Sequence, residues 1–231
     1  MDGLSVLADR ITSCVQCPRL VEWRERVAHE RRAAFADETY WGRPVPGFGD
    51  PDARIVVLGL APAAHGANRT GRMFTGDRSG DWLYAALWRA GLANQPTSVA
   101  RRDGLRLLDS YVTSALRCAP PANRPTPEER DRCAPWLEQE LRELHRGRVV
   151  LSLGAFATHA VARLFGLAPA PTFAHGAQRR WTADSASPWP GRDVALVCSY
   201  HPSQQNTFTG KLTEPMFDDA IAAAVELANG L

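Results

Sequence analysis

Lysine is nearly absent from this chain of 231 residues, since Lys211 is the only lysine among 27 basic residues. Arginine therefore carries the positive charge, and its planar fork binds phosphate well. Alanine and proline are also abundant, so a GC-rich genome explains the arginine bias more simply than a nucleic-acid partner does. The net charge of +2 does not by itself require such a partner.

Long apolar runs are also absent, and this excludes several kinds of protein. No run approaches the roughly 20 residues that cross a bilayer, and the N-terminus lacks the apolar core of a signal peptide. The sequence contains neither a GxGxxG loop nor a GxxxxGK loop followed by Ser or Thr, the usual phosphate-binding loops. We therefore expect a cytoplasmic protein without a membrane partner, and not one of the common nucleotide-binding folds.

Four short apolar runs predict the strands of a sheet. They are rich in β-branched residues, are bounded by turn residues, and lie at Ile55–Leu58, Tyr111–Ala115, Val149–Leu153 and Val194–Cys198. Apolar spacing predicts helices at Leu4–Cys17 and Ser79–Ala90, and the N-cap Thr126 followed by Pro127 and two acidic residues predicts a helix from Thr126 to about His145. Further helices are predicted at Arg19–Arg32, Ala155–Phe165 and Pro215–Leu231. The stretches predicted to be irregular are Arg117–Pro127 and Pro169–Gly191.

This alternation predicts an α/β fold in which a four-stranded parallel sheet lies between two layers of helices. The length and the ordinary composition, 45% hydrophobic and 23% charged, predict a single domain over residues 1–231. We expect the domain to act as a monomer.

The segment Gly59–Asp77 follows the first predicted strand and precedes a predicted helix. Its four glycines and one proline predict a loop without regular structure. A strand, a glycine-rich loop and a helix together build ligand sites at the carboxyl edge of α/β sheets. The loop combines polar side chains with one aromatic ring, in His65, Asn68, Arg69, Arg72, Phe74 and Asp77. Its chemistry indicates a ligand site without specifying the ligand.

Four of the five cysteines fall into two pairs, Cys14 with Cys17 and Cys118 with Cys133. In a cytosolic protein, a C-x-x-C pair more often binds a metal or is redox-active than forms a structural disulfide. Four thiolates suit either a zinc ion or an iron–sulfur cluster, and their spacing does not decide between the two. Cys198 lies inside a predicted strand and is expected to be a core residue.

Four separated features of the sequence together resemble the uracil-DNA glycosylase superfamily. They are the segment GLAPAAHGANRTGRMFTGD, the stretch YVTSALRCAPPANRPTPEE, the stretch YHPSQQNTFTGKLT and the four-cysteine pattern. The chain is most similar to the iron–sulfur-containing family 5, or type b, from roughly Cys14 to the C-terminal helix. The resemblance implies removal of uracil, and of bases such as hypoxanthine and ethenocytosine, from DNA. It also implies a 4Fe-4S cluster held by Cys14, Cys17, Cys118 and Cys133.

The resemblance assigns roles to several residues of the predicted site. A base must be flipped out of the duplex before its glycosidic bond can be cleaved. Phe74 resembles the residue that stacks on the flipped base, and His201 resembles the donor to the departing base oxygen. Asp77 and Asn123 are the candidates to position water, a carboxylate being the better base. The alternative for Asp77 is a plain helix N-cap.

The sequence departs from most of the superfamily at two places. Leu60 and Ala61 stand where many relatives carry a side chain that activates water, a departure typical of type b. Ser114 stands where many relatives carry an Asn that reads the base, which fits a tolerance for several bases. The residues expected to contact the base are Phe74, Ala61, Ala63, His65 and Ser114. Those expected to contact DNA are Asn68, Arg69, Arg72, Ser203, Gln204, Gln205, Asn206 and Lys211.

Three hypotheses about function follow. The first is a monofunctional DNA glycosylase of base excision repair, acting on the bacterial nucleoid. The second is a non-catalytic protein that binds damaged or single-stranded DNA, in which Ala61 marks lost catalysis. The third is a redox protein built on the cluster.

Overall fold

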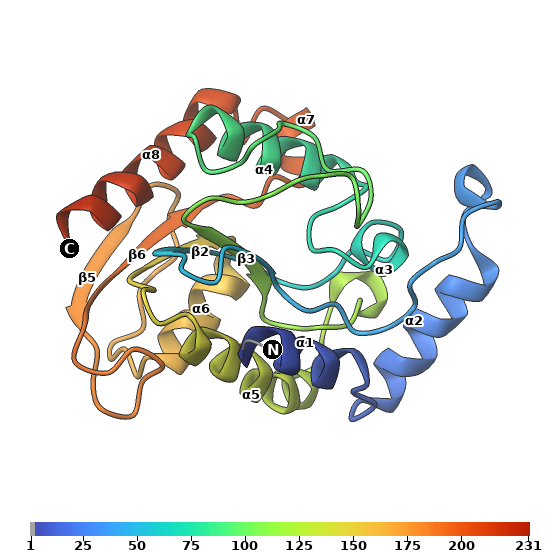
Figure 1. Ribbon diagram of the computed structural model, residues 1–231, viewed down its shortest axis with the longest axis horizontal. Helices are drawn as coiled ribbons and strands as arrows, with labels where there is room; N and C mark the ends of the chain where they lie inside the picture. The colour runs from blue at the N-terminus through green and yellow to red at the C-terminus, as the bar shows by residue number, and fades with distance from the viewer. Residues whose placement is uncertain (1–2) are drawn as a thin grey trace.

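The computed structural model describes residues 3–231, so Met1 and Asp2 of the expected domain lie outside the described residues. A sheet runs through the centre, in the strand order β1-β3-β2-β4-β6-β5 (Figure 1). Its six strands are β1 (Phe48–Gly49), β2 (Ile55–Gly59), β3 (Ser110–Ser114), β4 (Val149–Leu153), β5 (Gln178–Thr182) and β6 (Asp193–Ser199). The four middle strands are parallel and coincide with the four predicted ones.

The two edge strands were not predicted from the sequence. β1 has only two residues and pairs antiparallel with β3. β5 pairs antiparallel with β6 and lies in the stretch 169–191 that was expected to be irregular. Its side chains alternate between exposed and half-buried, so it lacks the apolar run of a central strand. The sheet is therefore mixed and six-stranded, not purely parallel and four-stranded.

Helices cover both faces of the sheet and complete the expected three-layer α/β fold (Figure 1). On one face lie α4 (Arg78–Arg89) and α8 (Glu214–Gly230), and on the other lie α1 (Gly3–Thr12), α5 (Pro127–Glu143) and α6 (Ala155–Leu164). Successive strand residues enter opposite cores: Val57 belongs to the core that contains Leu83 of α4, and Val56 to the core that contains Val161 of α6. Burial on both faces explains why the central strands are continuously apolar.

The remaining helices are α2 (Pro18–Glu30), α3 (Ala67–Thr70), α7 (Gln204–Phe208) and the 3-10 turns η1 (Ala33–Phe35) and η2 (Pro121–Asn123). α3 corrects the expectation that Gly59–Asp77 is wholly irregular, and η2 does the same for the stretch 117–127. α5 begins where the sequence predicted, because Thr126 and Glu129 form a capping box. The Thr126 hydroxyl accepts from the Glu129 N–H at 3.3 Å, and the Glu129 carboxylate accepts from the Thr126 N–H at 2.8 Å.

The parallel register brings the carboxyl ends of the central strands to one edge. Gly59 at the end of β2 pairs with Ser114 at the end of β3, and Leu153 of β4 pairs with Ser199 of β6. The loops that follow these strands therefore leave the sheet side by side, which is where α/β proteins bind ligands. Within residues 3–231, no helix has both the length and the apolarity to cross a membrane.

Candidate active site and cysteine site

A pocket opens at the carboxyl edge of the sheet, where the loops after β2, β3 and β6 meet. This edge pocket has about 1080 Å³ of empty volume, is open to solvent, and is lined by Leu60, Ala61, Ala63, Asp77, Arg78, Ser79, Asn123, His201, Ser203, Gln204 and Gln205. Asp77, Asn123 and His201 come from three separate segments of the chain, and all three reach its wall. Ala61 and Ala63, which were expected to contact a base, also line it.

Asp77 is both the N-cap of α4 and a wall of the edge pocket. Its Oδ1 accepts a hydrogen bond from the Gly80 N–H at 3.0 Å. Its Oδ2 faces Gly66, where a methyl group would lie only 2.1 Å away, so the glycine makes room for the carboxylate. Burial raises the pKa of Asp77 above its ordinary value, against the opposing effect of the Gly80 and Ser79 N–H groups. Asp77 is therefore an N-cap, as the alternative held, and its Oδ1 accepts the Gly80 bond.

His201 and Phe74 lie ring beside ring. Their centroids are 5.7 Å apart and their planes differ by 29°. Burial lowers the pKa of His201 from 6.5 to about 4, so its imidazole is neutral at pH 7. No described residue hydrogen-bonds to either ring nitrogen. Since a neutral imidazole retains one N–H, His201 is able to donate one hydrogen bond to a ligand.

Two glycines give Phe74 its position. Its backbone adopts the left-handed region, with φ of +50°. The ring rests on Gly59, where a methyl group would come 2.6 Å from Cζ, and the carbonyl oxygen rests on Gly80, where a methyl group would come 1.8 Å away. The end of β2 and the first turn of α4 must therefore both be glycine for this aromatic ring to lie beside His201.

Asn123 reaches the edge pocket through the turn η2. Ala122 and Asn123 both adopt the left-handed region, with φ of +52° and +55°. Asn tolerates this region better than most residues because its side chain bonds locally, whereas Ala does not. Two such residues in succession reverse the chain after Pro120 and leave Asn123 exposed on the wall of the pocket.

Ser114 and Asn68 do not lie in the edge pocket. Ser114 is 1% exposed, and its hydroxyl donates to the carbonyl of Leu116 at 2.5 Å. Asn68 is also 1% exposed, and its amide donates to the carbonyl of Arg24 at 3.2 Å, while its Oδ1 has no partner among the described residues. Both side chains stabilise the interior of the loops instead of presenting polar groups outward.

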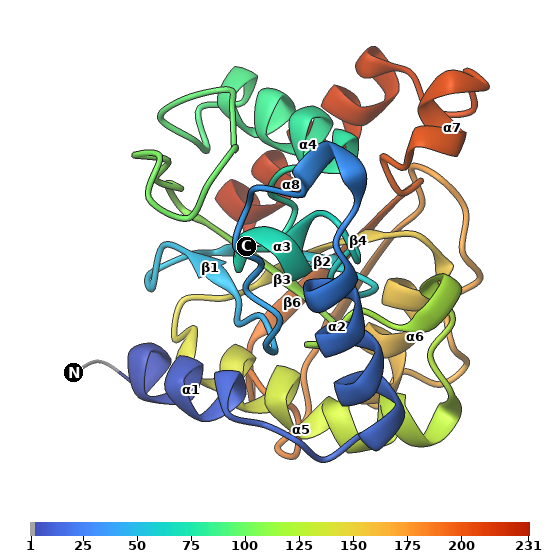
Figure 2. The ribbon, with the colours of Figure 1, turned by 90° about the vertical axis from the view of Figure 1, so that its right-hand side faces the viewer.

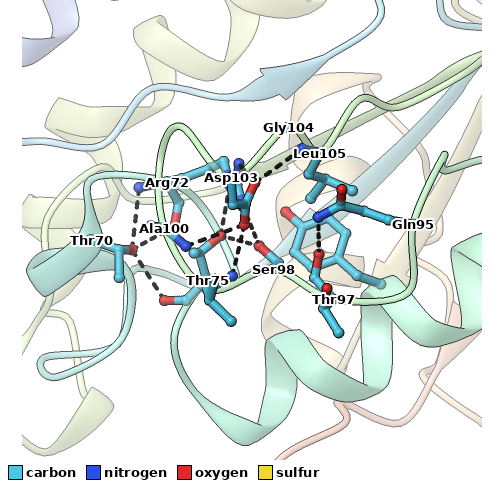
Figure 3. A network of polar contacts seen from close by, with 12 residues as sticks. Thr70, Arg72, Thr75, Gln95, Thr97, Ser98, Ala100, Asp103, Gly104 and Leu105 are labelled. Atoms are coloured by element: carbon cyan, nitrogen blue, oxygen red, sulfur yellow. Dashed lines mark hydrogen bonds and ion pairs between the residues drawn. The ribbon is translucent and has the colours of Figure 1, made fainter.

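Arg69 and Arg72 are buried and fully engaged within the protein. Arg69 pairs with Glu38 and donates to the carbonyl of Gly76 at 2.8 Å. Arg72 forms a bidentate ion pair with Asp103, at 2.9 and 2.7 Å, inside the network of Figure 3. These arginines were expected to contact DNA, and the structure instead places them where they fix the shape of the segment Gly59–Asp77 from within.

His65 lies beside the edge pocket, in a second hollow described below. Its Nδ1 is 3.0 Å from the hydroxyl of Tyr40. Burial lowers the pKa of His65, and the nearby Arg32 and Arg69 lower it further, so the ring is neutral at pH 7.

The residues after His201 form the short helix α7. Ser203 is its N-cap, with Oγ accepting from the Asn206 N–H at 3.3 Å, and the Asn206 amide donates to the carbonyl of His201 at 2.9 Å. These two side chains therefore hold the turn. Gln204 and Gln205 are exposed and line the edge pocket, so their amides are available to a ligand.

Two cations near α7 form no ion pair with any described residue. Lys211 lies over the ring of Tyr200, 4.7 Å from its centroid. Arg78, which the sequence analysis missed, lies over the ring of Phe208 at 4.3 Å, and its Nε donates to Thr207 Oγ1 at 3.2 Å. One feature of the sequence pointed to Arg78. A cation in the first turn of a helix is unfavourable because it opposes the helix dipole, which indicates that another interaction stabilises Arg78 at this position.

The four paired cysteines line one small cavity, which has about 330 Å³ of empty volume and which we call the cysteine site. Cys14 and Cys17 lie in the loop between α1 and α2, Cys118 follows β3, and Cys133 lies in α5. Burial raises the pKa of Cys118 to about 11 and that of Cys133 to about 12. Within residues 3–231, no group of three or more His, Cys, Asp or Glu side chains is able to hold a metal ion. Cys198 is buried in β6, as expected.

Hydrogen-bond donors surround the sulfurs of the cysteine site. Arg24 Nη1 donates to Cys118 Sγ at 3.0 Å, and the Arg117 N–H donates to Cys133 Sγ at 3.2 Å. The Arg24 side chain is 4% exposed, whereas Glu25, its only ion-pair partner among residues 3–231, lies 3.6 Å away and is 61% exposed. Burying a guanidinium without a buried counter-charge is costly. Arg24 and the Arg117 N–H therefore favour negative charge on these sulfurs, although burial alone favours the neutral thiols.

Comparisons with known proteins agree with the fold. The family model of the Uracil DNA glycosylase superfamily matches residues 46–225. The type-5 uracil-DNA glycosylase of Mycobacterium bovis is 54% identical over 221 residues, which are 94% of this chain and 79% of that relative. Those of Mycobacterium leprae and Thermus thermophilus are each 52% identical, covering 95% and 94% of this chain and 93% and 95% of the relatives. The resemblance found in the sequence is confirmed, and the chain belongs to the type-5 group of the uracil DNA glycosylase superfamily.

Proposed function

We propose that this protein is a monofunctional DNA glycosylase that hydrolyses the N-glycosidic bond of uracil in DNA and leaves an abasic site. The observation that carries the proposal is the convergence of Asp77, Asn123 and His201 on one pocket at the carboxyl edge of the sheet. The names of the type-5 relatives, which are uracil-DNA glycosylases, support the same activity. We extend the proposal to other deaminated or damaged bases, such as hypoxanthine and ethenocytosine.

His201 is proposed to stabilise the departing base. Glycosidic cleavage passes through an oxocarbenium-like sugar, and here the leaving base carries negative charge. His201 is neutral at pH 7, so it offers a hydrogen bond to the base oxygen without transferring a proton. Donors aimed at developing charge in a water-poor site contribute on the order of 10²–10³-fold to the rate.

Asp77 and Asn123 are proposed to position the attacking water. The Gly80 bond of the helix cap goes to Asp77 Oδ1, Oδ2 lies beside Gly66, and the carboxylate is a stronger base than the Asn123 amide. Asn123 can orient water but cannot take its proton. Leu60 and Ala61 line the same pocket and have no polar side-chain atom, so neither of them can polarise water.

The walls of the edge pocket suit a flat base. Phe74 is proposed to stack on it: the ring is not among the residues that line the pocket, but contacts with Gly59 and Gly80 hold it beside His201, which does line it. The small side chains of Ala61 and Ala63 leave room for bases of different shape. Ser114 and His65 lie outside this pocket, so we assign the tolerance for several bases to the small side chains.

The α7 loop is proposed to hold the DNA. Gln204 and Gln205 are exposed at the pocket mouth and suited to fill the space left by a flipped base. Ser203 and Asn206 keep the loop folded, and Lys211 supplies a phosphate contact. We further propose that the chain is a single domain, that it acts as a monomer, and that it acts on the nucleoid in the cytoplasm.

The cysteine site is proposed to hold a 4Fe-4S cluster. Such a cluster takes one thiolate from each of four cysteines, so the sulfurs need not converge on one ion. The buried Arg24 supports a negatively charged occupant. When bound, the cluster would cross-link the loop between α1 and α2 to the segment that runs from Cys118 to Cys133, and so brace the η2 turn that carries Asn123. A structural role is proposed in preference to a redox one.

The test is release of base from oligonucleotides that contain one uracil, in duplex and single-stranded form. The expected result is free uracil and an alkali-labile abasic site, with no product from the matching thymine oligonucleotide. Tight binding to uracil-DNA without abasic product would favour the non-catalytic binder. A change of cluster oxidation state in each turnover would favour the redox protein.

A further inference from the structure

A second hollow opens directly beside the edge pocket. This side hollow has about 980 Å³ of empty volume, and its walls include Trp23 of α2, Arg32, Phe35 of η1 and Arg78 of α4. It shares Asp77, Asn123 and Arg78 with the edge pocket, so the two form a continuous concave surface. Figure 2 shows α2 running along this side of the molecule next to α3, with which it is in contact.

The side hollow carries unpaired positive charge. Arg32 and Arg78 are both exposed, and neither forms an ion pair with a described residue. The only acidic residue among its described walls is Asp77, whose carboxylate caps α4 and faces Gly66. Arg69 and Arg72 carry the same charge a few residues away but are neutralised inside the protein by Glu38 and Asp103. Two free guanidinium groups on one concave wall are suited to an anion.

Arg78 is held in place before any ligand binds. Its guanidinium lies 4.3 Å from the centroid of the Phe208 ring, and its Nε donates to Thr207 at 3.2 Å. Phe208 is 64% exposed, so its ring is open to contact with the Arg78 side chain. The contact joins α4, which follows the loop after β2, to α7, which follows His201. Because the side chain is already ordered, less conformational entropy is lost when it binds an anion.

The remaining walls suit a flat, partly apolar ligand. Trp23 and Phe35 are half-buried, and each has an arginine over its ring, Arg26 at 5.0 Å and Arg69 at 3.9 Å. Cationic side chains next to aromatic walls match a nucleotide, which has an anionic phosphate and a base that stacks on aromatic rings.

We propose that the side hollow holds the nucleotide adjacent to the flipped one, with Arg78 and Arg32 binding the phosphodiester that joins the two. The inference rests on the proposed function, because it requires a flipped nucleotide in the edge pocket. It assigns the backbone contact to Arg78 and Arg32, residues that were not among those expected to bind DNA.

The test combines neutral linkages in the DNA with arginine variants. Oligonucleotides carry a fluorinated deoxyuridine that resists cleavage, with one flanking phosphodiester replaced by an uncharged methylphosphonate, on the 5′ or the 3′ side. Wild type is expected to bind one of the two modified oligonucleotides on the order of tenfold more weakly than the unmodified one. With that modified oligonucleotide, Arg78→Ala and Arg32→Ala are expected to bind nearly as well as wild type does, because the charge that each arginine would contact is already gone. Each variant should also flatten the plot of log affinity against log salt concentration, by about 0.9 for duplex and about 0.7 for single strands.

Two controls make the outcome decisive. Arg180→Ala, an exposed arginine on the edge strand β5, should leave both the affinity and the salt slope unchanged. Phe208→Leu should weaken binding while keeping the salt slope, since the charge of Arg78 remains. The inference is overturned if the loss of affinity in the arginine variants adds to the loss caused by the methylphosphonate at both linkages. It is also overturned if the salt slopes of the arginine variants equal that of wild type. If wild type releases no uracil and binds uracil and thymine oligonucleotides equally, the proposed function itself fails.

Discussion

Replacing Asp77 by asparagine or by alanine should separate the structural task of this side chain from its proposed catalytic task. Asparagine caps a helix about as well as aspartate, because its side-chain oxygen accepts the same N–H bond. Alanine removes the bond to the Gly80 N–H and costs about 1 kcal/mol of stability. For a chain of this length, that loss corresponds to a fall of about 2–4 °C in Tm.

The charge of Asp77 also acts on stability, and its sign can be worked out. Burial raises the pKa of Asp77 in the folded state, so folding favours the protonated form. The stabilisation is present at low pH and is lost as the pH rises from the ordinary value of 3.8 through the raised folded value. At neutral pH the charged carboxylate is therefore unfavourable in the fold. Asp77→Asn should have a Tm equal to or above that of wild type at pH 7, with the difference shrinking towards pH 4.

The catalytic effect should run the other way. Loss of a general base lowers a rate by about 10²–10⁴-fold, and both variants should show this loss in single-turnover release of uracil from a duplex. Asp77→Asn is thus expected to be as stable as wild type and strongly impaired. A wild-type rate in Asp77→Asn refutes the assignment of Asp77 as the base. A lower Tm in Asp77→Asn, accompanied by the loss of rate, would trace the loss to the fold instead.

Three further predictions concern the site and its surroundings. His201→Ala should lower the single-turnover rate by about 10²–10³-fold. The wild-type rate should not fall as the pH is lowered through 6.5, because the pKa of His201 is about 4. A fall near pH 6.5 that is absent from His201→Ala would contradict the assignment of His201 as a neutral hydrogen-bond donor. Gly66→Ala places a methyl group 2.1 Å from Asp77 Oδ2, so the carboxylate has to move. The substitution should lower the rate by up to about 10²-fold although it removes no reacting group. An unchanged rate would mean that the position of the Asp77 carboxylate does not affect catalysis. Arg24→Gln removes the buried cation at the cysteine site, so the purified protein should contain less iron per chain and show weaker visible absorption. The control Arg26→Gln, on the exposed side of α2, should match wild type in both measurements. Equal iron contents in the two variants would refute a role for Arg24 in holding the cluster.

The central strands were predictable because both of their faces are buried, which leaves an apolar run with turn residues at each end. The edge strand β5 was not, because three of its five residues are exposed and its sequence, Gln178–Thr182, is mostly polar. The helix boundaries followed from caps where the caps were specific, as at Thr126. Short helices such as α3 and α7 have too few residues to show a period.

The candidate site was predictable as a group of segments but not as a set of contacts. The carboxyl-edge rule predicted a ligand site at the segment Gly59–Asp77, and Asp77 lines one pocket with Asn123 and His201, which the resemblance assigned to the same site. The same sequence could not show that Arg72 is neutralised by Asp103, because that depends on how a distant loop folds back. Arg78 was missed because the residue that orders its side chain, Phe208, lies far along the chain, so the sequence does not show that the two are in contact.

The single lysine gives the protein one reactive side-chain amine. Amine-directed reagents modify lysine and the N-terminus but leave arginine unchanged, so Lys211 is the one side chain in the sequence that they label. It follows α7 by a few residues and lies over Tyr200, on the loop that leads away from His201. A fluorophore attached there reports from a defined place without any engineered cysteine, which would otherwise compete with the four thiols of the cysteine site. Protection of this amine by a bound oligonucleotide then maps the docking of one loop in a chain that needs no mutation.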